Sequence, residues 1–309
     1  MGKYLQIMQT FTLQNIPNLD TCVLAALELF SKTKLPSLPI SKWKRPLVIG
    51  SGNAAAIGQI IFNDHDAVYA NENSYQEKLL KIKNIDAVLI FSASGGKHAP
   101  LMAKEAKKRK KPVYLITNNQ KALAAKELPS QNVFIFPKNR EPYTYNTSTY
   151  LGMILGKTRE NPYHILQFIE KTIAKLNFPN FQNYGAFYLL LPPQFELMRE
   201  MLDKKFVEMF GRELAYSIFS TEYVKHATTI VKRPDELFIS FGDKNTLWGK
   251  DRFDLPLPAK ADYGSIMAVS YFIMGQIQKS KPPWFKKNIV SYCKEISAIF
   301  GNEIKPIVE

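Results

Sequence analysis

The stretch FSASGGKHAP, residues 91–100, places two hydroxyls and two glycines directly after an apolar run. Ser92 and Ser94 can donate hydrogen bonds, and Gly95 and Gly96 let backbone N–H groups converge on a ligand. A helical pattern follows, and the N-terminal end of a helix attracts an anion. The pattern predicts a site suited to a phosphate monoester. The competing interpretation is that Ser94 only caps the helix, a common role for serine.

A similar polar turn follows an earlier apolar run, in PLVIGSGNAAAIG. Gly52 and Asn53 stand where a helix is expected to begin, so this turn also offers amides to a ligand. Glu72 ends the next predicted strand about 20 residues later, where a dinucleotide-binding fold places its ribose-binding acid. Three interpretations stay open: a dinucleotide site, part of a phosphate site, or tight packing between strand and helix.

Apolar strands alternate with helical segments in both halves of the chain. The first half begins with a helix over Asp20–Lys32 and continues with the strand segments PLVIG, DAVYANEN, IDAVLIF, KPVYLITNN and NVFIFP. After a helical stretch over Thr149–Leu176 come AFYLLLPPQ, a helix over Phe195–Phe210, LAYSIFSTE, ELFISFGD and DLPLP. We expect an α/β fold of two subdomains, residues 1–160 and 161–309, each a parallel sheet flanked by helices in three layers.

The net charge of +14 is compatible with several anionic partners. Its densest cluster, Lys104–Lys111, fits the exposed face of one helix, and no zinc-knuckle, RNP-type or interleaved aromatic pattern accompanies it. A nucleic-acid partner therefore stays a minor alternative that rests on charge alone. The best membrane candidate, Ile266–Ile277, falls short of the roughly 20 apolar residues that a span needs, so we expect no membrane association.

The two cysteines, Cys22 and Cys293, lie at opposite ends of the chain, and no His/Cys/Asp cluster has the spacing of metal ligands. The opening residues lack the continuous apolar core of a secretion signal. From these features we expect a cytoplasmic protein that uses neither a metal nor an organic cofactor.

Several segments together resemble the tandem sugar isomerase (SIS) domain family: VIGSGNAAAIG, IFSASGGKHAPLMAKEAKKRKKPVYLITNN, YNTSTYLGMIL, DKKFVEMF with STEYVKHATT, and EIKPIVE. From about residue 20 on, the chain is similar to the isomerase half of glucosamine-6-phosphate synthase and to the stand-alone phosphoglucose/phosphomannose isomerases. The resemblance implies a homodimer that binds a phosphorylated sugar and interconverts the aldose and ketose forms of a hexose 6-phosphate. An amino-sugar phosphate deaminase and a non-catalytic sugar-phosphate sensor remain as alternatives.

For the phosphate, the resemblance implies binding by Ser92, Ser94 and the backbone at Gly95, with Ser148 and Thr149 closing the same pocket. The chain departs from the family at Lys97, which stands where a threonine is usual, and in the first turn, where Asn53 and Ala54 replace a hydroxyl residue. Lys97 could restore the binding as a point charge.

For the chemistry, the resemblance implies that Glu208 moves a proton between C1 and C2, with Lys205 beside it. His226 would help to open the sugar ring, and Lys305 would come from the C-terminal tail. On a helical wheel Glu208 lies on a partly apolar flank next to Lys205, so desolvation and the lysine act on its pKa in opposite directions. The competing interpretation is an ordinary surface salt bridge with Lys204 or Lys205.

Overall fold

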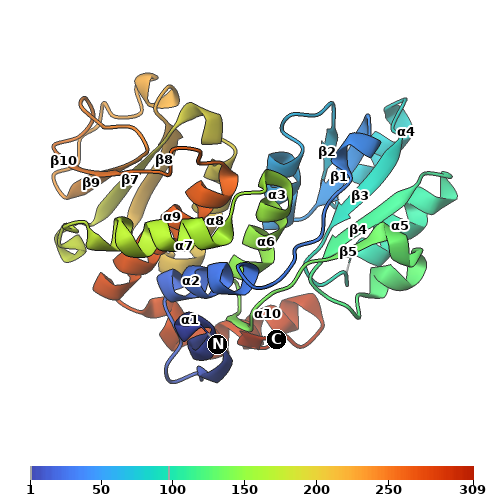
Figure 1. Cartoon of the computed structure of the whole chain (residues 1–309), viewed down its shortest axis with the longest axis horizontal. Helices are drawn as coiled ribbons and strands as arrows, with labels where there is room; N and C mark the ends of the chain where they lie inside the picture. The colour runs from blue at the N-terminus through green and yellow to red at the C-terminus, as the bar shows by residue number, and fades with distance from the viewer. Residues whose placement is uncertain (1, 97) are drawn as a thin grey trace. The chain divides into compact units, whose positions relative to one another are not determined.

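The computed structural model describes residues 2–96 and 98–309 and shows an α/β chain with two parallel sheets (Figure 1). Its contacts divide the chain into two compact units. The first-sheet unit comprises Thr33–Lys138 and Gly152–Arg159, and the second-sheet unit comprises the residues up to Lys32, Asn139–Leu151 and Glu160–Glu309. The single boundary expected between residues 160 and 161 separates the strands of the first sheet from those of the second. The compact units themselves are discontinuous in sequence.

The first-sheet unit is built on five parallel strands in the order β2-β1-β3-β4-β5. The strands are β1 (Pro46–Gly50), β2 (Val68–Ala70), β3 (Ala87–Phe91), β4 (Val113–Thr117) and β5 (Val133–Ile135). Strands β1, β3 and β4 are buried at every residue, which is why they appear in the sequence as unbroken apolar runs.

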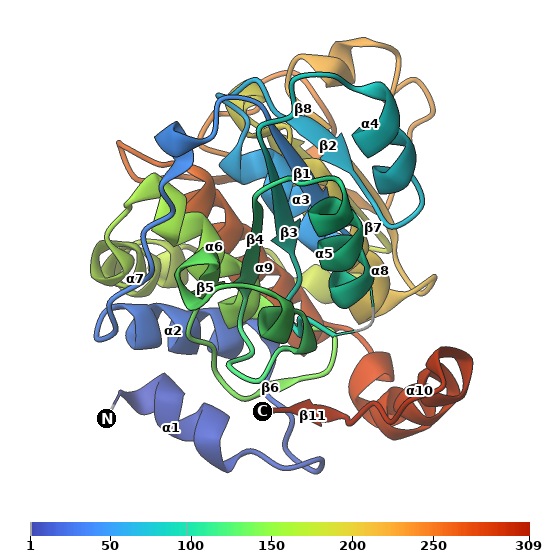
Figure 2. The same ribbon diagram turned by 90° about the vertical axis from the view of Figure 1, so that its right-hand side faces the viewer.

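Helices cover both faces of this sheet. On one face α4 (Tyr75–Lys81) and α5 (Ala99–Lys108) pack through Leu79, Met102 and Ala103 onto inward side chains of β1, β3 and β4 (Figure 2). On the other face α3 (Asn53–Ile61) approaches so closely that a Cβ on Gly58 would lie 2.6 Å from a methyl of Val48. Three layers result, as expected from the sequence.

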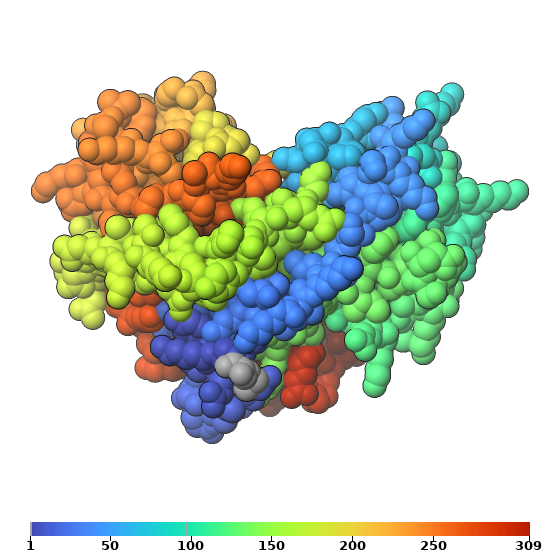
Figure 3. All heavy atoms as spheres, viewed as in Figure 1, coloured from blue at the N-terminus to red at the C-terminus, as the bar shows by residue number. Residues whose placement is uncertain are grey.

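The second-sheet unit carries four parallel strands in the order β10-β9-β7-β8. They are β7 (Ala186–Leu191), β8 (Ala215–Ser220), β9 (Glu236–Phe241) and β10 (Asp251–Leu255), with helices α1 (Lys3–Thr10), α2 (Leu19–Phe30), α7 (Pro162–Lys171), α8 (Met198–Phe210), α9 (Tyr263–Ser280) and α10 (Trp284–Phe300). Helix α7 lies on the surface, in yellow-green in Figure 3.

The core of this unit lies between the sheet and its helices. The ring of Phe206 on α8 lies 6.3 Å from that of Phe187 on β7, and α2 packs along the wholly buried middle of α9. The opposite face of the sheet, with Tyr188 and Leu190, is covered by Val224 and Trp248 from the loops after β8 and β9. Covered on both faces, the central strands β7 and β9 are buried at nearly every residue, as their apolar sequences require, whereas the edge strands β8 and β10 are only partly buried.

Two short strands and one more helix complete the chain. β6 (Glu141–Pro142) pairs antiparallel with β11 (Ile307–Val308), which attaches the C-terminal tail. α6 (Thr147–Thr158) contributes residues to both units. Among the helices formed by the described residues, none is both long enough and apolar enough to cross a bilayer.

Two helical expectations are wrong in detail. The continuous helix over Thr149–Leu176 is broken between α6 and α7, because Arg159 adopts a φ of 61° and Asn161 caps a new helix that begins at Pro162. The helix expected from Phe195 begins at Met198, after a 3₁₀ turn that starts with a proline.

Candidate functional site

The two polar turns of the first-sheet unit follow neighbouring strands. β1 ends at Gly50 and β3 ends at Phe91, and these two residues face each other in the parallel pair. The chain runs from β1 to β2 on one side and then to β3 on the other, so the strand order reverses here. Ligands of open parallel sheets bind at such a switch point, outside the carboxyl ends of the strands. The topology thus brings both predicted turns to one edge of the sheet.

Serine hydroxyls and backbone amides pair within the turn after β3. The Gly95 N–H donates to Ser92 Oγ at 3.1 Å, and the Gly96 N–H donates to Ser94 Oγ at 3.3 Å. Because each hydroxyl accepts here, each retains its own proton for another acceptor. Ser94 is exposed and Ser92 is half-buried. The turn therefore presents two hydroxyl donors next to α5, each held by a backbone amide, and hydroxyl donors near the beginning of a helix suit phosphate oxygens.

Residues at the end of β4 and just after it hold the backbone of this turn in place. Thr117 Oγ1 donates to the Ala93 carbonyl at 3.0 Å, and the Asn119 side-chain amide donates to the Ser94 carbonyl at 2.9 Å. Gly95 has a φ of 60°, and a Cβ on it would lie only 2.4 Å from the Cβ of Ala122. Sequence reasoning gave no role to Thr117 and Asn119, although both lie in the polar end of the predicted strand segment KPVYLITNN. They fix the backbone of the turn without occupying its open side.

The turn after β1 is tied to β2 through Glu72. The Ser51 hydroxyl donates to Glu72 Oε2 at 2.7 Å. Glu72, which has the sequence spacing of the ribose-binding acid in dinucleotide-binding folds, therefore contacts this turn. Gly52 has a φ of 57° and open space around its Cα. Asn53 is 8% exposed, and its Oδ1 has no hydrogen-bond partner among the described residues. This turn offers a backbone and an amide to a ligand, but its one hydroxyl is already used. Lys97 lies outside the described residues.

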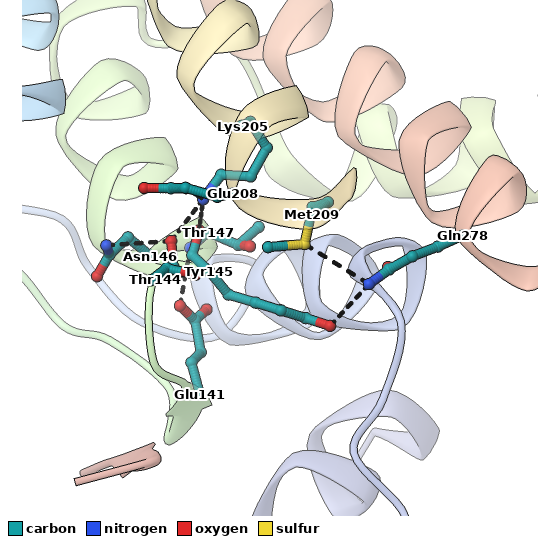
Figure 4. Close-up of polar contacts among 9 residues, drawn as sticks. All are labelled: Glu141, Thr144, Tyr145, Asn146, Thr147, Lys205, Glu208, Met209 and Gln278. Atoms are coloured by element: carbon teal, nitrogen blue, oxygen red, sulfur yellow. Dashed lines mark hydrogen bonds and ion pairs between the residues drawn. The ribbon is translucent and has the colours of Figure 1, made fainter. Parts of the chain in front are cut away.

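Lys205 and Glu208 of the second-sheet unit form an ion pair one helical turn apart on α8 (Figure 4). Lys205 is completely buried, and its Nζ donates to Glu208 Oε2 at 2.6 Å, to the Tyr145 carbonyl at 2.8 Å and to the Thr144 carbonyl. All three ammonium protons are therefore used. The side chain of Glu208 is 27% exposed. The salt bridge with Lys205 that the alternative interpretation predicted is present, but it is not an ordinary surface pair, because the lysine is fully buried.

Tyrosines surround this pair. Burial, followed by the charge of Tyr292, raises the pKa of Tyr143 to about 12, with Glu208 contributing. Burial and the Glu208 carboxylate both raise the pKa of Tyr150. Burial raises the pKa of Tyr271 well above its usual value, and its hydroxyl has no hydrogen-bond partner among the described residues. The carboxylate of Glu208 thus lies among neutral phenols and one buried ammonium group.

Glu141 occupies the N-terminal end of α6. Its carboxylate accepts from the backbone N–H groups of Thr147 and Ser148, both at 2.7 Å, and it is 4% exposed. Ser148 is fully buried and its hydroxyl accepts from the Asn139 N–H at 2.8 Å; Thr149 is 4% exposed. Both hydroxyl residues thus lie in the interior at the beginning of α6. Their phosphate role stays a prediction, and sequence reasoning did not identify Glu141 as the residue that caps these amides.

The last two predicted residues lie on separate segments. His226 is exposed, and its ring lies 5.9 Å from that of Tyr223. Lys305 is exposed in the tail between α10 and β11. Within the described residues, no hydrogen bond or ion pair joins either of them to Glu208. The described residues also contain no group of three or more His, Cys, Asp or Glu placed to hold a metal ion.

Comparison with known proteins shows the fold. No family model and no curated protein matches the chain. Solved structures do: tagatose-6-phosphate ketose/aldose isomerase from Escherichia coli is 12% identical with a TM-score of 0.57, and the match covers 91% of this chain and 93% of that one. Glucosamine-6-phosphate deaminase from Thermotoga maritima is 17% identical with a TM-score of 0.55, over 90% and 94%.

The C-terminal domain of glucosamine-fructose-6-phosphate aminotransferase from Francisella tularensis is similar as well. It is 9% identical with a TM-score of 0.52, and the match covers 90% of this chain and 95% of that one. These matches extend over nearly all of both chains, so the fold expected from the SIS resemblance is confirmed for both halves. At such low identity, the likeness is one of fold alone.

Proposed function

We propose that the chain binds a phosphorylated sugar whose phosphate lies on the turn Ser92–Gly96. The observation that carries this proposal is the pair of serine hydroxyls, each held by a backbone amide and each with its own proton available, at a strand switch point next to the beginning of α5. Structures of the same fold include proteins that are named for tagatose 6-phosphate and glucosamine 6-phosphate. That likeness supports a phosphosugar over other phosphate esters.

We further propose that the reaction is an aldose–ketose isomerisation of a hexose 6-phosphate. Such a reaction needs one group that takes a proton from the carbon beside the carbonyl and returns it to the neighbouring carbon. Glu208 is our candidate for this group, because its carboxylate is partly exposed and is held by a buried lysine. His226 and Lys305 are the candidates for ring opening and substrate binding.

The phosphate proposal is tested by replacing both serines. Ser92→Ala with Ser94→Ala should weaken the binding of fructose 6-phosphate by a few kcal/mol in calorimetry, because a hydrogen bond to a charged group contributes roughly 1.5 to 3 kcal/mol. Ser130→Ala, at an exposed serine of the same unit, is the matched control and should bind as the wild type does. Equal affinity in the double variant and the control would place the phosphate elsewhere.

The reaction is tested with solvent deuterium and four sugar phosphates: fructose 6-phosphate, glucose 6-phosphate, mannose 6-phosphate and glucosamine 6-phosphate. An isomerase should place deuterium at C1 or C2 during turnover, because the base exchanges its proton with water. Release of ammonia from glucosamine 6-phosphate would identify a deaminase. Saturable binding without exchange at either carbon would identify a sensor and overturn the isomerase proposal.

A further inference from the structure

A cavity of about 210 Å³ lies within the second-sheet unit at the carboxyl ends of β7, β8 and β9. The loops after β8 and β9 form most of its wall, in gold and orange at the upper left of Figures 1 and 3. The side chains that bear on its chemistry are Thr221, Glu222, Lys225, Asp243, Lys244 and Trp248. The cavity is smaller than the roughly 300 to 1,000 Å³ of drug-sized sites, so it suits a small molecule.

The topology of the second sheet favours binding at this point. The strand order β10-β9-β7-β8 means that the chain leaves β7 for β8 on one side and then reaches β9 on the other. The crevice between the ends of β7 and β9 is therefore a switch point, where ligands of open parallel sheets bind. It is the same position, in its own sheet, that the turns after β1 and β3 occupy in the first.

The loop after β9 is held in one shape before any ligand arrives. Asn245 is 8% exposed, and its Oδ1 accepts from the N–H groups of Leu247 and Trp248 while its Nδ2 donates to the Trp248 carbonyl at 2.7 Å. The Asn245 N–H in turn donates to Asp254 Oδ1 at 3.0 Å. Pre-organisation of this kind lowers the entropic cost of binding.

Two charged groups of this loop remain available. Asp243 and Lys244 are exposed, and neither forms an ion pair with another described residue. Glu222 and Lys225, across the cavity, pair with each other at 2.7 Å. The cavity thus has two carboxylates and two ammonium groups and no surplus of positive charge, in a chain whose net charge is +14.

The equal number of carboxylates and ammonium groups indicates which class of ligand the cavity would bind. Carboxylates only accept hydrogen bonds and ammonium groups only donate them. A phosphate dianion offers acceptors alone and would be repelled by Asp243 and Glu222. A hydroxyl both donates and accepts, so a neutral polyhydroxylated molecule can satisfy both kinds of group, and Trp248 supplies the apolar wall that small-molecule sites usually contain.

We propose that this cavity is a binding site for a small neutral polyhydroxylated ligand, of the class of an unphosphorylated hexose. The site belongs to the second-sheet unit and does not depend on the phosphate site proposed for Ser92 and Ser94. Asp243 accepts ligand hydroxyls, Lys244 donates to ligand oxygens, and Trp248 borders the ring.

The test uses NMR spectroscopy of the full chain, with nitrogen-15 in its three tryptophans, to follow their indole N–H signals. Trp248→Phe assigns one signal to Trp248. Glucose, mannose and fructose, each without phosphate, are titrated in turn, and inorganic phosphate forms a separate arm. We expect at least one hexose to move the Trp248 signal saturably at millimolar concentrations, and inorganic phosphate to leave it in place.

Asp243→Asn and Lys244→Met should each weaken that response roughly tenfold or more, the effect of losing one charged hydrogen bond. Because both residues are exposed, the melting temperature of each variant should equal that of the wild type. Lys260→Met, at an exposed lysine that lines neither this cavity nor the neighbouring one bordered by Trp248, is the control. The proposal is overturned if no hexose moves the signal, if the variants respond as the wild type does, or if phosphate alone moves it through Lys244. A response lost in Ser92→Ala with Ser94→Ala would also overturn it, whereas its survival there separates this site from the phosphate proposal.

Discussion

Lys205 shows how one buried charge can organise several elements. Its ammonium group lies between α8 and the turn before α6, and there it contacts one carboxylate and two backbone carbonyls. Two residues of that turn, Thr144 and Asn146, have positive φ values of 70° and 47°. Such a turn is strained for non-glycine residues. The buried lysine helps to compensate for this strain because it satisfies carbonyls that no helix or strand would reach.

Replacing Lys205 with Met should therefore destabilise the protein strongly. Removing one partner of a buried pair leaves the other without compensation, at a cost of about 3 to 5 kcal/mol. Lys204→Met on the same helix is the matched control, because Lys204 is partly exposed and pairs with Glu200 at the surface; its loss should cost about 0.5 kcal/mol or less. Chemical denaturation of both variants measures the difference, and equal midpoints would contradict the role given to Lys205.

Glu208→Gln should separate binding from turnover. Glutamine keeps the size of the side chain and an oxygen that can accept from Lys205, but it cannot take up a proton as a carboxylate does. Binding of the sugar phosphate should survive, while turnover falls by about 10² to 10⁴. Calorimetry and a coupled assay measure the two quantities separately. A variant that turns over at the wild-type rate would show that Glu208 has only a structural part in the pair with Lys205.

At the scale of elements, α6 begins on a buried carboxylate. Glu141 accepts from two amides of the first turn, where the partial positive charge of the helix is greatest. Burial nevertheless raises the pKa of Glu141 above its ordinary value of 4.5, against the effect of those amides and of Lys205. The desolvation cost therefore outweighs the favourable contacts.

This balance predicts a pH dependence of stability. The folded protein binds the Glu141 proton more tightly than the unfolded chain does, so the proton stabilises the fold at low pH. That contribution should be lost as the pH rises from about 4.5 through the raised pKa. The free energy of unfolding of the wild type should consequently fall relative to that of Glu141→Gln over this range. A difference that grows in favour of the wild type with rising pH would contradict the assignment.

The turn after β3 should be sensitive to one methyl group. Gly95→Ala places a Cβ against Ala122 in a residue with a φ of 60°. We expect a loss of about 2 to 4 kcal/mol, of which the left-handed conformation accounts for roughly 1 to 2. Gly95→Ala combined with Ala122→Gly removes the clash and should recover part of the loss in thermal unfolding. An unchanged loss in the double variant would assign the whole effect to the backbone conformation.

The sequence predicted the elements far better than the contacts between them. Strands such as β1, β3 and β7 are recognisable because burial on both faces leaves them wholly apolar. The polar turns after β1 and β3 are recognisable for the same reason, since they interrupt those runs. In contrast, the apolar pattern runs through the break between α6 and α7, which depends on a positive φ at Arg159 and is marked in the sequence only by the cap residue Asn161 and by Pro162.

The candidate site was only partly predictable. Lys205 and Glu208 are three positions apart on one helix, so their pairing follows from helical spacing. The complete burial of Lys205 depends on a turn 60 residues away in sequence, and Glu141 reaches α6 through a turn of unusual conformation. The polar lining of the cavity after β9 also arises from a loop that lacks regular structure. Such contacts depend on tertiary structure, which local patterns do not encode.

At the scale of the whole molecule, the second-sheet unit is assembled from both ends of the chain. The segment up to Lys32 contributes α2, which is buried along most of its length and packs on α9. At Gly275 a Cβ would lie 2.1 Å from the backbone nitrogen of Asp20. The two helices are therefore in contact at the level of their backbones, and each covers a large part of the other's apolar surface.

Because α9 packs on α2, we expect that a fragment with the first sheet folds on its own and that a fragment with α9 but without α2 does not. A chain of residues 33–159 contains the whole first sheet and its helices and should unfold cooperatively on heating, followed by circular dichroism. A chain of residues 160–309 lacks α2, exposes the apolar face of α9, and should aggregate or bind a hydrophobic dye. Adding residues 1–32 to the second fragment should reduce the dye binding. A well-folded 160–309 fragment would contradict the dependence of α9 on α2.

The backbone of Leu19 donates to the side chain of Gln278, a residue 259 positions further on. A ribosome that adds roughly 5 to 20 residues per second needs between about ten seconds and a minute to cover that distance. Throughout this interval α2 has emerged from the ribosome without its partner, while the first-sheet unit between them can already fold. The part of the apolar surface of α2 that α9 later covers is thus exposed on the nascent chain for this whole interval, and it is a surface to which a holding chaperone would bind.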